Sequence, residues 1–536
     1  MACLGVFVAY LPVTTVSVSL PAIQRALGAS TSQLSWVSDA FVLPMAALIL
    51  TTGVWGDVHG RKRVFQTGMA LCALGAAISL FSDSVQGVWA GQAASGLGAA
   101  ALLPTTLALI SHAVPDHRER GKFIGLWAMS LMGSLAVGSL IAGTLLEHVG
   151  WRWIFLLPIP VSLIVLVVAA FLLPDSRAPH GRRLDWPGQI SAAVAVSAVV
   201  YGVIEGGADG FGEPVVVATL ALGAVAAVVF VLVERRSTSP MLDLALFHSP
   251  AFTATTLVAM ISFLGLIGFF FVLSLYFGMV QHLSTIDAAL RMVLMSGTSL
   301  LVAVPVGRLM HRVPARVLIT SGLVVAAAAM FSLNTVDAGT SYGAMAWRLV
   351  LLGLGMGAVM TPMTASAVSS VPFRLAGMAA AGNNAFRQVG GALGPAVLGA
   401  LLTTRAVDAL PGRLADAGVP DRTAALVVDT AREQGLGAVA GLDLDAATGQ
   451  ALGALSESFL DGMRLCMTVA GSLALLAALA CALLLRPAGS GAAGTSAGAT
   501  APPARDGDAS GGLGPRGTGT GTGTAPAPAP VAETSP

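Results

Sequence analysis

Charged residues are scarce in this chain of 536 residues, of which 10% are charged and 55% are hydrophobic. An ordinary soluble domain carries about 25% charged residues. The only lysines are Lys62 and Lys122, and the formal net charge is +1. This composition excludes a soluble globular domain. The sequence also lacks a basic or aromatic-interleaved stretch that would indicate a nucleic-acid partner.

Signals for cofactors and metals are also lacking. Cys3, Cys72, Cys466 and Cys481 lie in apolar runs without metal or disulfide spacing, so we interpret them as small hydrophobic residues. The sequence has no phosphate-binding Gly-Lys-Ser/Thr loop, which argues against ATP as the energy source. It also has no His/Asp/Glu cluster and no nucleophile with a nearby base in its apolar runs. We therefore expect no cofactor, no metal site and no enzymatic activity.

Long apolar runs are what the chain has in abundance. An α-helix of about 20 apolar residues crosses the ~30 Å hydrocarbon layer of a membrane. The weakest of the runs is 187–206. The predicted spans are 4–23, 36–56, 64–82, 87–112, 123–146, 154–173, 187–206, 214–233, 252–276, 288–309, 316–335, 342–368, 378–403 and 460–486. The sequence thus predicts an all-α membrane protein with fourteen transmembrane helices.

Basic residues are distributed unevenly between the two sets of connecting loops. With the N-terminus inside, the cytoplasmic loops hold both lysines and most of the loop arginines, and the short outer loops hold only Arg25 and Arg152. Because short cytoplasmic loops carry an excess of Lys and Arg, both termini are predicted to be cytoplasmic. The apolar run that follows Met1 has no basic residues before it, so we expect no cleaved signal peptide.

Two segments lie outside the predicted spans. Residues 404–459 are predicted to form a long outer loop, in which the spacing of Ala and Leu permits short amphipathic helices. Residues 487–536 are rich in Gly, Thr, Pro and Ala and have few side chains to bury, so a disordered cytoplasmic tail is predicted. Neither segment is expected to carry chemistry.

The sequence contains an internal repeat. The stretch "GVWGDVHGRKRVF" at 53–65 has the same layout as "PVGRLMHRVPAR" at 305–316: a Gly near a helix end, a polar residue four places on, then basic residues. Both stretches fall between the second and third spans of a six-helix set. Two homologous halves follow, which is a common plan of secondary transporters.

Several motifs resemble those of a known family. Gly53, Asp57, Gly60, Arg61 and Lys62, in the spacing G-x3-D-x2-G-R-K, resemble the signature loop of the major facilitator superfamily. The segments "WVSDAF" at 36–41, "GWRWIF" at 150–155, "YGVIEGG" at 201–207 and "GNNAFRQVGGALG" at 382–394 are similar to those of its fourteen-span drug:proton antiporters. The resemblance covers nearly all of residues 1–486.

This resemblance implies a fold and a function. It implies two six-helix bundles, 1–173 and 251–486, with two inserted helices in 174–250. It also implies proton-coupled export of drugs, antibiotics or related amphiphilic small molecules by alternating access across a bacterial inner membrane. In relatives the Asp of the signature loop lies against basic residues and a helix N-terminus of the opposite half and holds the cytoplasmic side closed, a role that falls here to Asp57. The expected partners are a small-molecule substrate, the proton and membrane lipid, with a monomeric protein and no nucleic acid.

Ionisable residues inside spans are costly to bury, so each is a functional candidate. Asp39 is the favoured proton-coupling residue because its apolar neighbours favour the neutral acid; the alternative is a wetted residue at the outer interface. Arg387 is either a structural or a coupling residue. Glu205 is a third coupling candidate, or else an outer-surface carboxylate. Asp461 and Arg464 are three residues apart, a spacing that allows them to pair.

Two further groups of residues are candidates. The helix-kink motif comprises Gly138 and Gly143 in the fifth span and Gly394 and Pro395 in the equivalent span of the second half. Relatives have Pro where this chain has Ser139, so a Pro kink is expected in one half only. The predicted substrate pocket combines aromatic and amide side chains, although aromatic residues at such positions also serve in packing. It comprises Trp36, Gln92, Trp127, Asn383, Asn384 and Gln388.

The first half departs from the family pattern. Pro12 stands where relatives have Asp, Ser17 where they have Asn, and Gln92 where they have Arg. Losing one member of a buried ion pair costs several kcal/mol, whereas losing both can be nearly neutral, so the joint absence is coherent. It favours neutral or weakly ionised substrates over permanently cationic drugs. It also leaves open an alternative function, a facilitator or importer of an endogenous metabolite without proton antiport.

Overall fold

The computed structural model describes residues 1–114, 117–173, 185–237, 239–310, 312–371, 375–433, 435–442 and 447–485. Within these ranges fourteen helices are long and apolar enough to cross a membrane, and the same ranges contain no β-strand. Each helix corresponds to one predicted span, including the weakest at 187–206, so the predicted all-α membrane fold is confirmed. The predicted tail, 487–536, lies outside the described residues.

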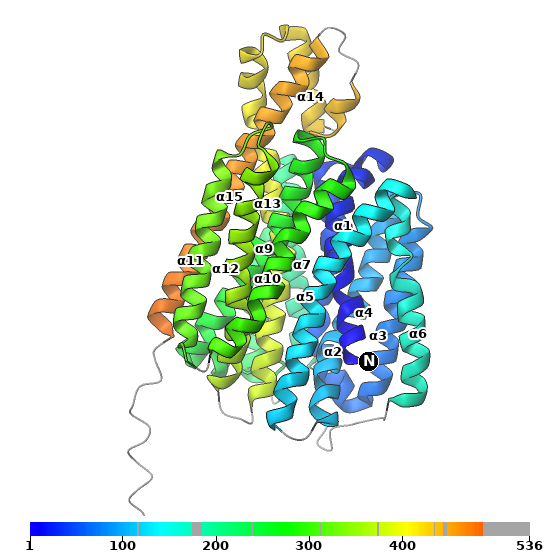
Figure 1. Cartoon of the computed structure of the whole chain (residues 1–536), viewed down its shortest axis with the longest axis vertical. Coiled ribbons are helices and arrows are strands. Elements are labelled where there is room, and N and C mark those ends of the chain that lie inside the picture. The colour runs from blue at the N-terminus through cyan, green and yellow to red at the C-terminus, as the bar shows by residue number, and fades with distance from the viewer. Residues whose placement is uncertain are drawn as a thin grey trace, which may run out of the picture. The chain divides into compact units, whose positions relative to one another are not determined.

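The elements follow one another along the chain as Figure 1 shows. They are α1 (Ala2–Leu27), α2 (Thr31–His59), α3 (Arg61–Leu80), α4 (Val85–Ala113), α5 (His117–His148), η1 (Trp151–Phe155), α6 (Pro158–Leu172), α7 (Trp186–Asp209), α8 (Pro214–Arg236), η2 (Leu244–His248), α9 (Pro250–Leu275), η3 (Tyr276–Val280), α10 (Thr285–Leu309), α11 (Ala315–Ser332), η4 (Leu333–Thr335), α12 (Tyr342–Ser369), α13 (Ala376–Asp416), α14 (Asp421–Glu433), η6 (Ala438–Gly441) and α15 (Thr448–Leu484).

The two halves repeat one packing pattern. In the first half α1 packs on α5, and both α2 and α3 pack on α4. In the second half α9 packs on α13, and both α10 and α11 pack on α12. The halves meet where α1 packs on α9, α2 on α13, and α5 on α10. These three contacts form the seam between the halves.

Glycines of the helix-kink motif allow close helix contact at equivalent places in both halves. A Cβ on Gly138 of α5 would overlap Thr14 Oγ1 in α1. A Cβ on Gly394 of α13 would lie 2.7 Å from the backbone nitrogen of Gly268 in α9. Small residues at such positions let helix backbones approach, which is how membrane helices gain packing energy. Gly143 is also buried, and Pro395 lies inside α13.

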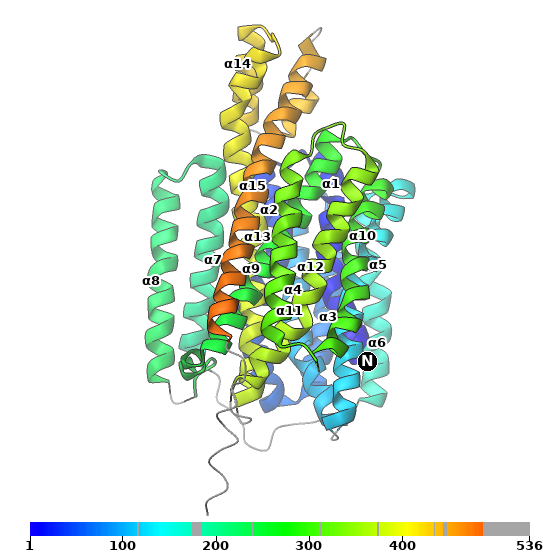
Figure 2. The ribbon, with the colours of Figure 1, turned by 60° about the vertical axis from the view of Figure 1, so that its left-hand side comes forward.

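The inserted helices α7 and α8 lie beside the bundles, with α8 at the edge in Figure 2. α7 packs on α2 and α13, and α8 packs on α7. Gln189 of α7 donates a hydrogen bond to Ala47 O of α2 at 2.5 Å, and it also pairs with the Thr51 hydroxyl of α2. The inserted pair is therefore attached to the first half through α7.

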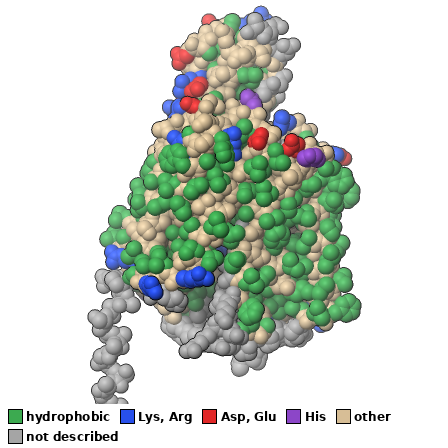
Figure 3. All heavy atoms as spheres, in the orientation of Figure 1, with side chains coloured by type: hydrophobic (Ala, Val, Ile, Leu, Met, Phe, Trp, Pro, Cys, Tyr) green, Lys and Arg blue, Asp and Glu red, His purple; other side chains and the backbone are tan. Residues whose placement is uncertain are grey.

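On the face shown in Figure 3, apolar side chains cover the middle, and most charged side chains lie above and below it. On α6 and α8, large apolar residues are exposed, among them Ile164 at 63% and Val228 at 60%. Exposed apolar patches of this extent are rare on soluble proteins. This surface fits contact with lipid.

Residues 404–459 differ from the predicted loop, because most of their described part is helical. α13 continues to Asp416, α15 begins at Thr448, and α14 and η6 lie between them. Leu410, Leu414 and Val427 bury their side chains in a hydrophobic core that is separate from the core of the bundles. The predicted amphipathic spacing thus produces a folded unit, which we call the cap (residues 404–459).

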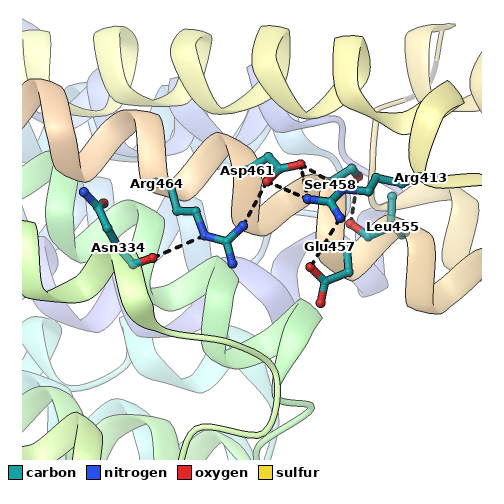
Figure 4. A network of polar contacts seen from close by, with 7 residues as sticks. All are labelled: Asn334, Arg413, Leu455, Glu457, Ser458, Asp461 and Arg464. Atoms are coloured by element: carbon teal, nitrogen blue, oxygen red, sulfur yellow. Dashed lines mark hydrogen bonds and ion pairs between the residues drawn. The ribbon is translucent and has the colours of Figure 1, made fainter. Parts of the chain in front are cut away.

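Three charged residues fix the base of the cap to the second half (Figure 4). Arg413 of α13 donates to both carboxylate oxygens of Asp461 in α15, at 2.8 and 2.9 Å. Arg464 donates to the same carboxylate at 2.9 Å and to Asn334 O at 3.3 Å. The predicted pairing of Asp461 with Arg464 is confirmed, and Arg413 is an additional partner.

The molecule has two membrane faces. The basic face contains the α2–α3 turn at Gly60, the end of α8 at Arg236 and the start of α9 at Pro250, and the cap face contains the α1–α2 turn at 28–30 and the cap. At the cap face the halves approach closely. A Cβ on Gly278 would lie 2.6 Å from Pro21 of α1. The two halves are therefore in contact at the cap face.

Candidate transport site on the seam between the halves

Asp39 is a fully buried carboxylic acid in α2, with 0% of its surface exposed. Neither of its carboxylate oxygens has a hydrogen-bond partner in the described part of the chain. The alternative of a wetted outer residue does not hold in this arrangement. An unpaired carboxylate ion in such a place is costly, so this side chain can be buried cheaply only as the neutral acid.

The position of Asp39 follows from the packing of α2 on α13. Ser35 and Val42 of α2 face α13: a Cβ on Gly399 would lie 2.8 Å from Ser35 Oγ, and a Cβ on Gly391 would lie 3.3 Å from Val42 Cγ1. Residues four and three positions apart on a helix share one face, so Asp39 lies between these two contacts on the same face. This places the acid on the seam between the halves.

Arg387 of α13 is also buried on this seam, with 8% of its surface exposed. Its Nη2 donates a hydrogen bond to the hydroxyl of Tyr10 in α1 at 3.0 Å. Its Cζ lies 4.6 Å from the centre of the Phe263 ring in α9, which is a cation–π contact. Gln388 Nε2 donates to the same Tyr10 hydroxyl at 2.8 Å. Two donors of the second half thus converge on one oxygen of the first half.

The two asparagines beside Arg387 differ in their surroundings. Asn383 is buried and donates to Thr255 O of α9 at 3.2 Å, so it joins two helices of one half. Asn384 Oδ1 has no hydrogen-bond partner in the described chain, and Ser262 Oγ of α9 has none either. Buried polar groups without partners indicate places where water or a ligand completes the hydrogen bonding.

Glu205 of α7 is partly buried and has a hydrogen-bond partner in α2. It accepts a hydrogen bond from Trp36 Nε1 of α2 at 3.1 Å. The Trp36 ring contacts Trp89 and Tyr201, with ring centres 6.3 and 5.9 Å apart. The structure therefore joins Trp36, a predicted pocket residue, to Glu205, a predicted coupling residue, in a contact between α2 and α7.

Gln92 and Pro12 line one small cavity inside the first half, together with Thr15 and Cys72. The family resemblance described above implies Arg and Asp at these two positions, and the structure places both residues beside one cavity. Trp127 is buried in the same half and donates to Thr106 Oγ1 at 3.0 Å. Of the six predicted pocket residues, the structure brings only Gln388 into contact with the Tyr10 hydroxyl.

The signature loop is a tight turn between α2 and α3. Gly60 has φ of 105°, a conformation that favours glycine, and a Cβ on Gly53 would only touch Pro104 at 3.4 Å.

Arg61 donates to Ala108 O at 3.4 Å, and Lys62 donates to Ala170 O at 2.7 Å. Both cations thus lie near the C-terminal ends of α4 and α6, where the helix dipole favours positive charge. The side chain of Asp57, and His311 of the repeated motif, lie outside the described residues.

Tyr10 and Phe263 escape detection from the sequence. Each is one aromatic residue in an apolar span, where aromatic residues normally pack, and nothing in its neighbourhood indicates a polar partner. The scarcity of tyrosine, with 4 in the whole chain, is the only available hint.

These features define a class of protein. Two repeated helical bundles meet along a seam that buries an unpaired acid and a guanidinium, which is the arrangement of a secondary transporter. The profile of the Major Facilitator Superfamily matches residues 2–395 of this chain. The chain belongs to the major facilitator superfamily, and it is a membrane transporter rather than an enzyme.

The most similar relatives include two antibiotic resistance proteins. The chain is 33% identical over 492 residues to the tetracenomycin C resistance and export protein of Streptomyces glaucescens, covering 90% of each chain. It is 34% identical over 409 residues to the puromycin resistance protein pur8 of Streptomyces alboniger, covering 76% of this chain and 80% of the relative. Among solved structures, an auto-inhibited POT family peptide transporter aligns over 90% of this chain and 97% of its own, with a TM-score of 0.59 and 14% identity. That likeness concerns the fold alone.

Proposed function

We propose that this transporter exports antibiotics or related amphiphilic small molecules in exchange for protons. The two relatives described above are resistance proteins for tetracenomycin C and puromycin, and the first is named as an export protein. Both come from bacteria, so we place the chain in a bacterial plasma membrane. In alternating access the halves rock about the seam and expose a central site to one side at a time.

The observation that carries proton coupling is the burial of Asp39 without a partner. The acid is fully buried on the seam while the halves are in contact at the cap face. Opening the seam to water would let the acid ionise, whereas closing it favours the neutral form. A proton gradient drives transport only if the proton and the substrate favour different conformations. Asp39 gives the proton such a preference, because the protonated acid favours the closed seam and the ionised acid favours the open one.

The orientation is part of the proposal. Excess Arg and Lys in the turns of the basic face support a cytoplasmic location for this face and for both termini. The cap would then lie outside the cell. A single cysteine at Leu426 of α14, which is 50% exposed, should react in intact cells with a membrane-impermeant maleimide. Labelling only after cell lysis would contradict this orientation.

Proton coupling can be tested in everted membrane vesicles that carry a respiration-driven proton gradient. Addition of a transported antibiotic, from a panel that includes puromycin and tetracenomycin C, should dissipate the gradient in vesicles with the wild-type protein. Asp39→Asn keeps the size of the side chain but removes the titrating group, so it should abolish this response at equal protein level. Glu205→Gln tests the other coupling candidate; we expect it to keep the response, because an amide oxygen can still accept from Trp36.

The rival function is a facilitator without proton antiport. The absence of charge at Pro12 and Gln92, which line one cavity, favours it. A facilitator would move substrate down its own gradient, and Asp39→Asn would leave the rate unchanged. Substrate movement without any proton flux in the wild type would therefore replace our proposal with this rival.

A further inference from the structure

Arg387 is a buried cation whose charge is not neutralised within the described chain. No ion pair of the described residues includes it, and its Nε has no hydrogen-bond partner. Its contacts are the Tyr10 hydroxyl, at 3.0 Å, and the face of Phe263. Buried charges are normally paired, because an uncompensated ion costs several kcal/mol to desolvate. The site therefore has an electrostatic preference for an anion.

The geometry also specifies what kind of anion fits. Arg387 Nη2 and Gln388 Nε2 converge on one oxygen, at 3.0 and 2.8 Å, and this oxygen belongs to a phenol. The Phe263 ring lies against the guanidinium. An acidic oxygen attached to an aromatic body would make the same two hydrogen bonds, and bonds to an ionised acceptor are roughly twice as strong as bonds to a neutral one.

We propose, in an inference that rests on the proposed function, that Arg387 and Gln388 bind an acidic oxygen of the substrate. This oxygen belongs to a phenolate, enolate or carboxylate group on an aromatic amphiphile. The Tyr10 hydroxyl occupies the place of that oxygen while the seam is closed. Tyr10 belongs to α1 of the first half and its two donors belong to α13 of the second half. Rocking of the halves withdraws the tyrosine and leaves two buried donors for the substrate to satisfy.

The surroundings of the site disfavour cations. A positive charge close to Arg387 would be repelled, because like charges interact more strongly inside a protein than in water. Pro12 and Gln92 provide no negative charge in the first half. No ion pair of the described residues joins Arg387 to Asp39, the acid on the same seam. The seam thus favours acidic over cationic ligands of the same shape.

Three dyes with one xanthene skeleton test this preference: fluorescein, its neutral ether–ester derivative and the cationic rhodamine 123. Uptake into everted vesicles should be highest for fluorescein, lower for the neutral dye and lowest for rhodamine 123. Arg387→Gln should lower uptake of fluorescein about tenfold, as for a loss of about 1.4 kcal/mol, and leave the neutral dye nearly unchanged. Arg387→Lys, which keeps the charge, should retain a measurable part of the preference. Tyr10→Phe removes the competing oxygen and should lower the KM for fluorescein alone.

Arg291→Gln is the matched control. Its guanidinium also lies over aromatic rings, at 5.6 Å from Phe277 and 5.4 Å from Tyr342, and donates to Gln281 Oε1 at 2.6 Å. Loss of this charge should not alter the order of the dyes. Size-exclusion profiles of each purified variant establish that the protein is folded.

The inference would be overturned if Arg387→Gln lowered the uptake of all three dyes equally. It would also be overturned if the wild-type protein preferred rhodamine 123. It would also be overturned if the variant changed only the proton flux per molecule transported, because Arg387 would then serve coupling. Binding of the dyes to purified protein, measured by fluorescence anisotropy, tests the preference even without transport. Absence of transport for every dye and antibiotic would count against the proposed function, whereas transport without charge preference counts against this inference alone.

Discussion

Glu205 in α7 accepts a hydrogen bond from Trp36 Nε1 in α2 at 3.1 Å. At the other end of α7, Gln189 donates to Ala47 O of α2 at 2.5 Å. The inserted helix is therefore hydrogen-bonded to the first half near both of its ends. It also contacts the second half, where Gly207 closely approaches Ala400 of α13. We expect α7 to move with α2 when the halves rock.

The Glu205–Trp36 bond predicts a difference between two substitutions. Glu205→Gln keeps an acceptor for the indole N–H, so thermal stability should change little. Glu205→Leu leaves the N–H of a partly buried tryptophan unpaired and should cost about 1 to 2 kcal/mol. Thermal unfolding of the purified variants in detergent measures this. Equal melting temperatures for the two variants would show that the bond does not contribute to stability.

Contact between the cap and the first half predicts that the cap must move during transport. A Cβ on Gly437 would overlap Gln24 Nε2 of α1, so cysteines at these two positions should be joined by a short bis-maleimide in a background with Cys3→Ser. Because outward opening separates the halves, cross-linked protein should lose export.

A pair with Gln24→Cys and Leu426→Cys is the control for that experiment, since Leu426 is exposed on α14. This pair should cross-link poorly and keep export after the same treatment. Full export from completely cross-linked Gln24/Gly437 protein would show that the cap does not follow the movement of the halves.

The charged network at the base of the cap predicts local destabilisation. Asp461→Asn removes the carboxylate to which both Arg413 and Arg464 donate. We expect faster hydrogen exchange in α14, with a local loss on the order of 1 kcal/mol because Arg413 is partly exposed. Glu457→Gln should have little effect, because Glu457 is 4.0 Å from Arg413 and 45% exposed. Similar exchange in the two variants would contradict this role.

The close approach of α13 and α9 predicts a strong effect at Gly394. A Cβ there would lie 2.7 Å from the backbone of Gly268, which cannot easily move. Gly394→Ala should lower the yield of folded protein, although Ala itself favours helix by about 1 kcal/mol. Gly297→Ala is the control, because a Cβ added there would have no neighbouring atom within 4 Å. Fluorescence-detected size exclusion compares the two, and equal yields would show that this contact tolerates a methyl group.

Much of the fold is predictable from residue type and spacing. A membrane requires helices of about 20 apolar residues, so each span leaves a signal that depends on its own sequence. The helices at 404–459 are harder to predict because their apolar faces are short and alternate with charged residues such as Asp408 and Asp429. Their helical extent depends on mutual burial of Leu410 and Leu414 of α13 with Val427 of α14.

The site was only partly predictable. Asp39 and Arg387 are visible because ionisable residues are rare in apolar spans. Trp36 and Glu205 are also visible, but their contact with one another depends on how α7 packs on α2. The predicted pocket grouped residues by chemistry alone, and the structure disperses them: Trp127 and Gln92 lie inside the first half, and Asn383 joins α13 to α9.

The sequence by itself determined the number of membrane helices, the repeat of two halves and the family, because these depend on local apolar length and on motifs within single loops. Only the tertiary structure decided which polar groups meet. Tyr10 receives hydrogen bonds from Arg387 and Gln388 across the seam, and no local pattern encodes a contact between helices so far apart in the chain. The physical reason is that the free-energy cost of removing a polar side chain from water depends on that residue alone. The hydrogen bonds that offset this cost depend on which neighbours the packing supplies.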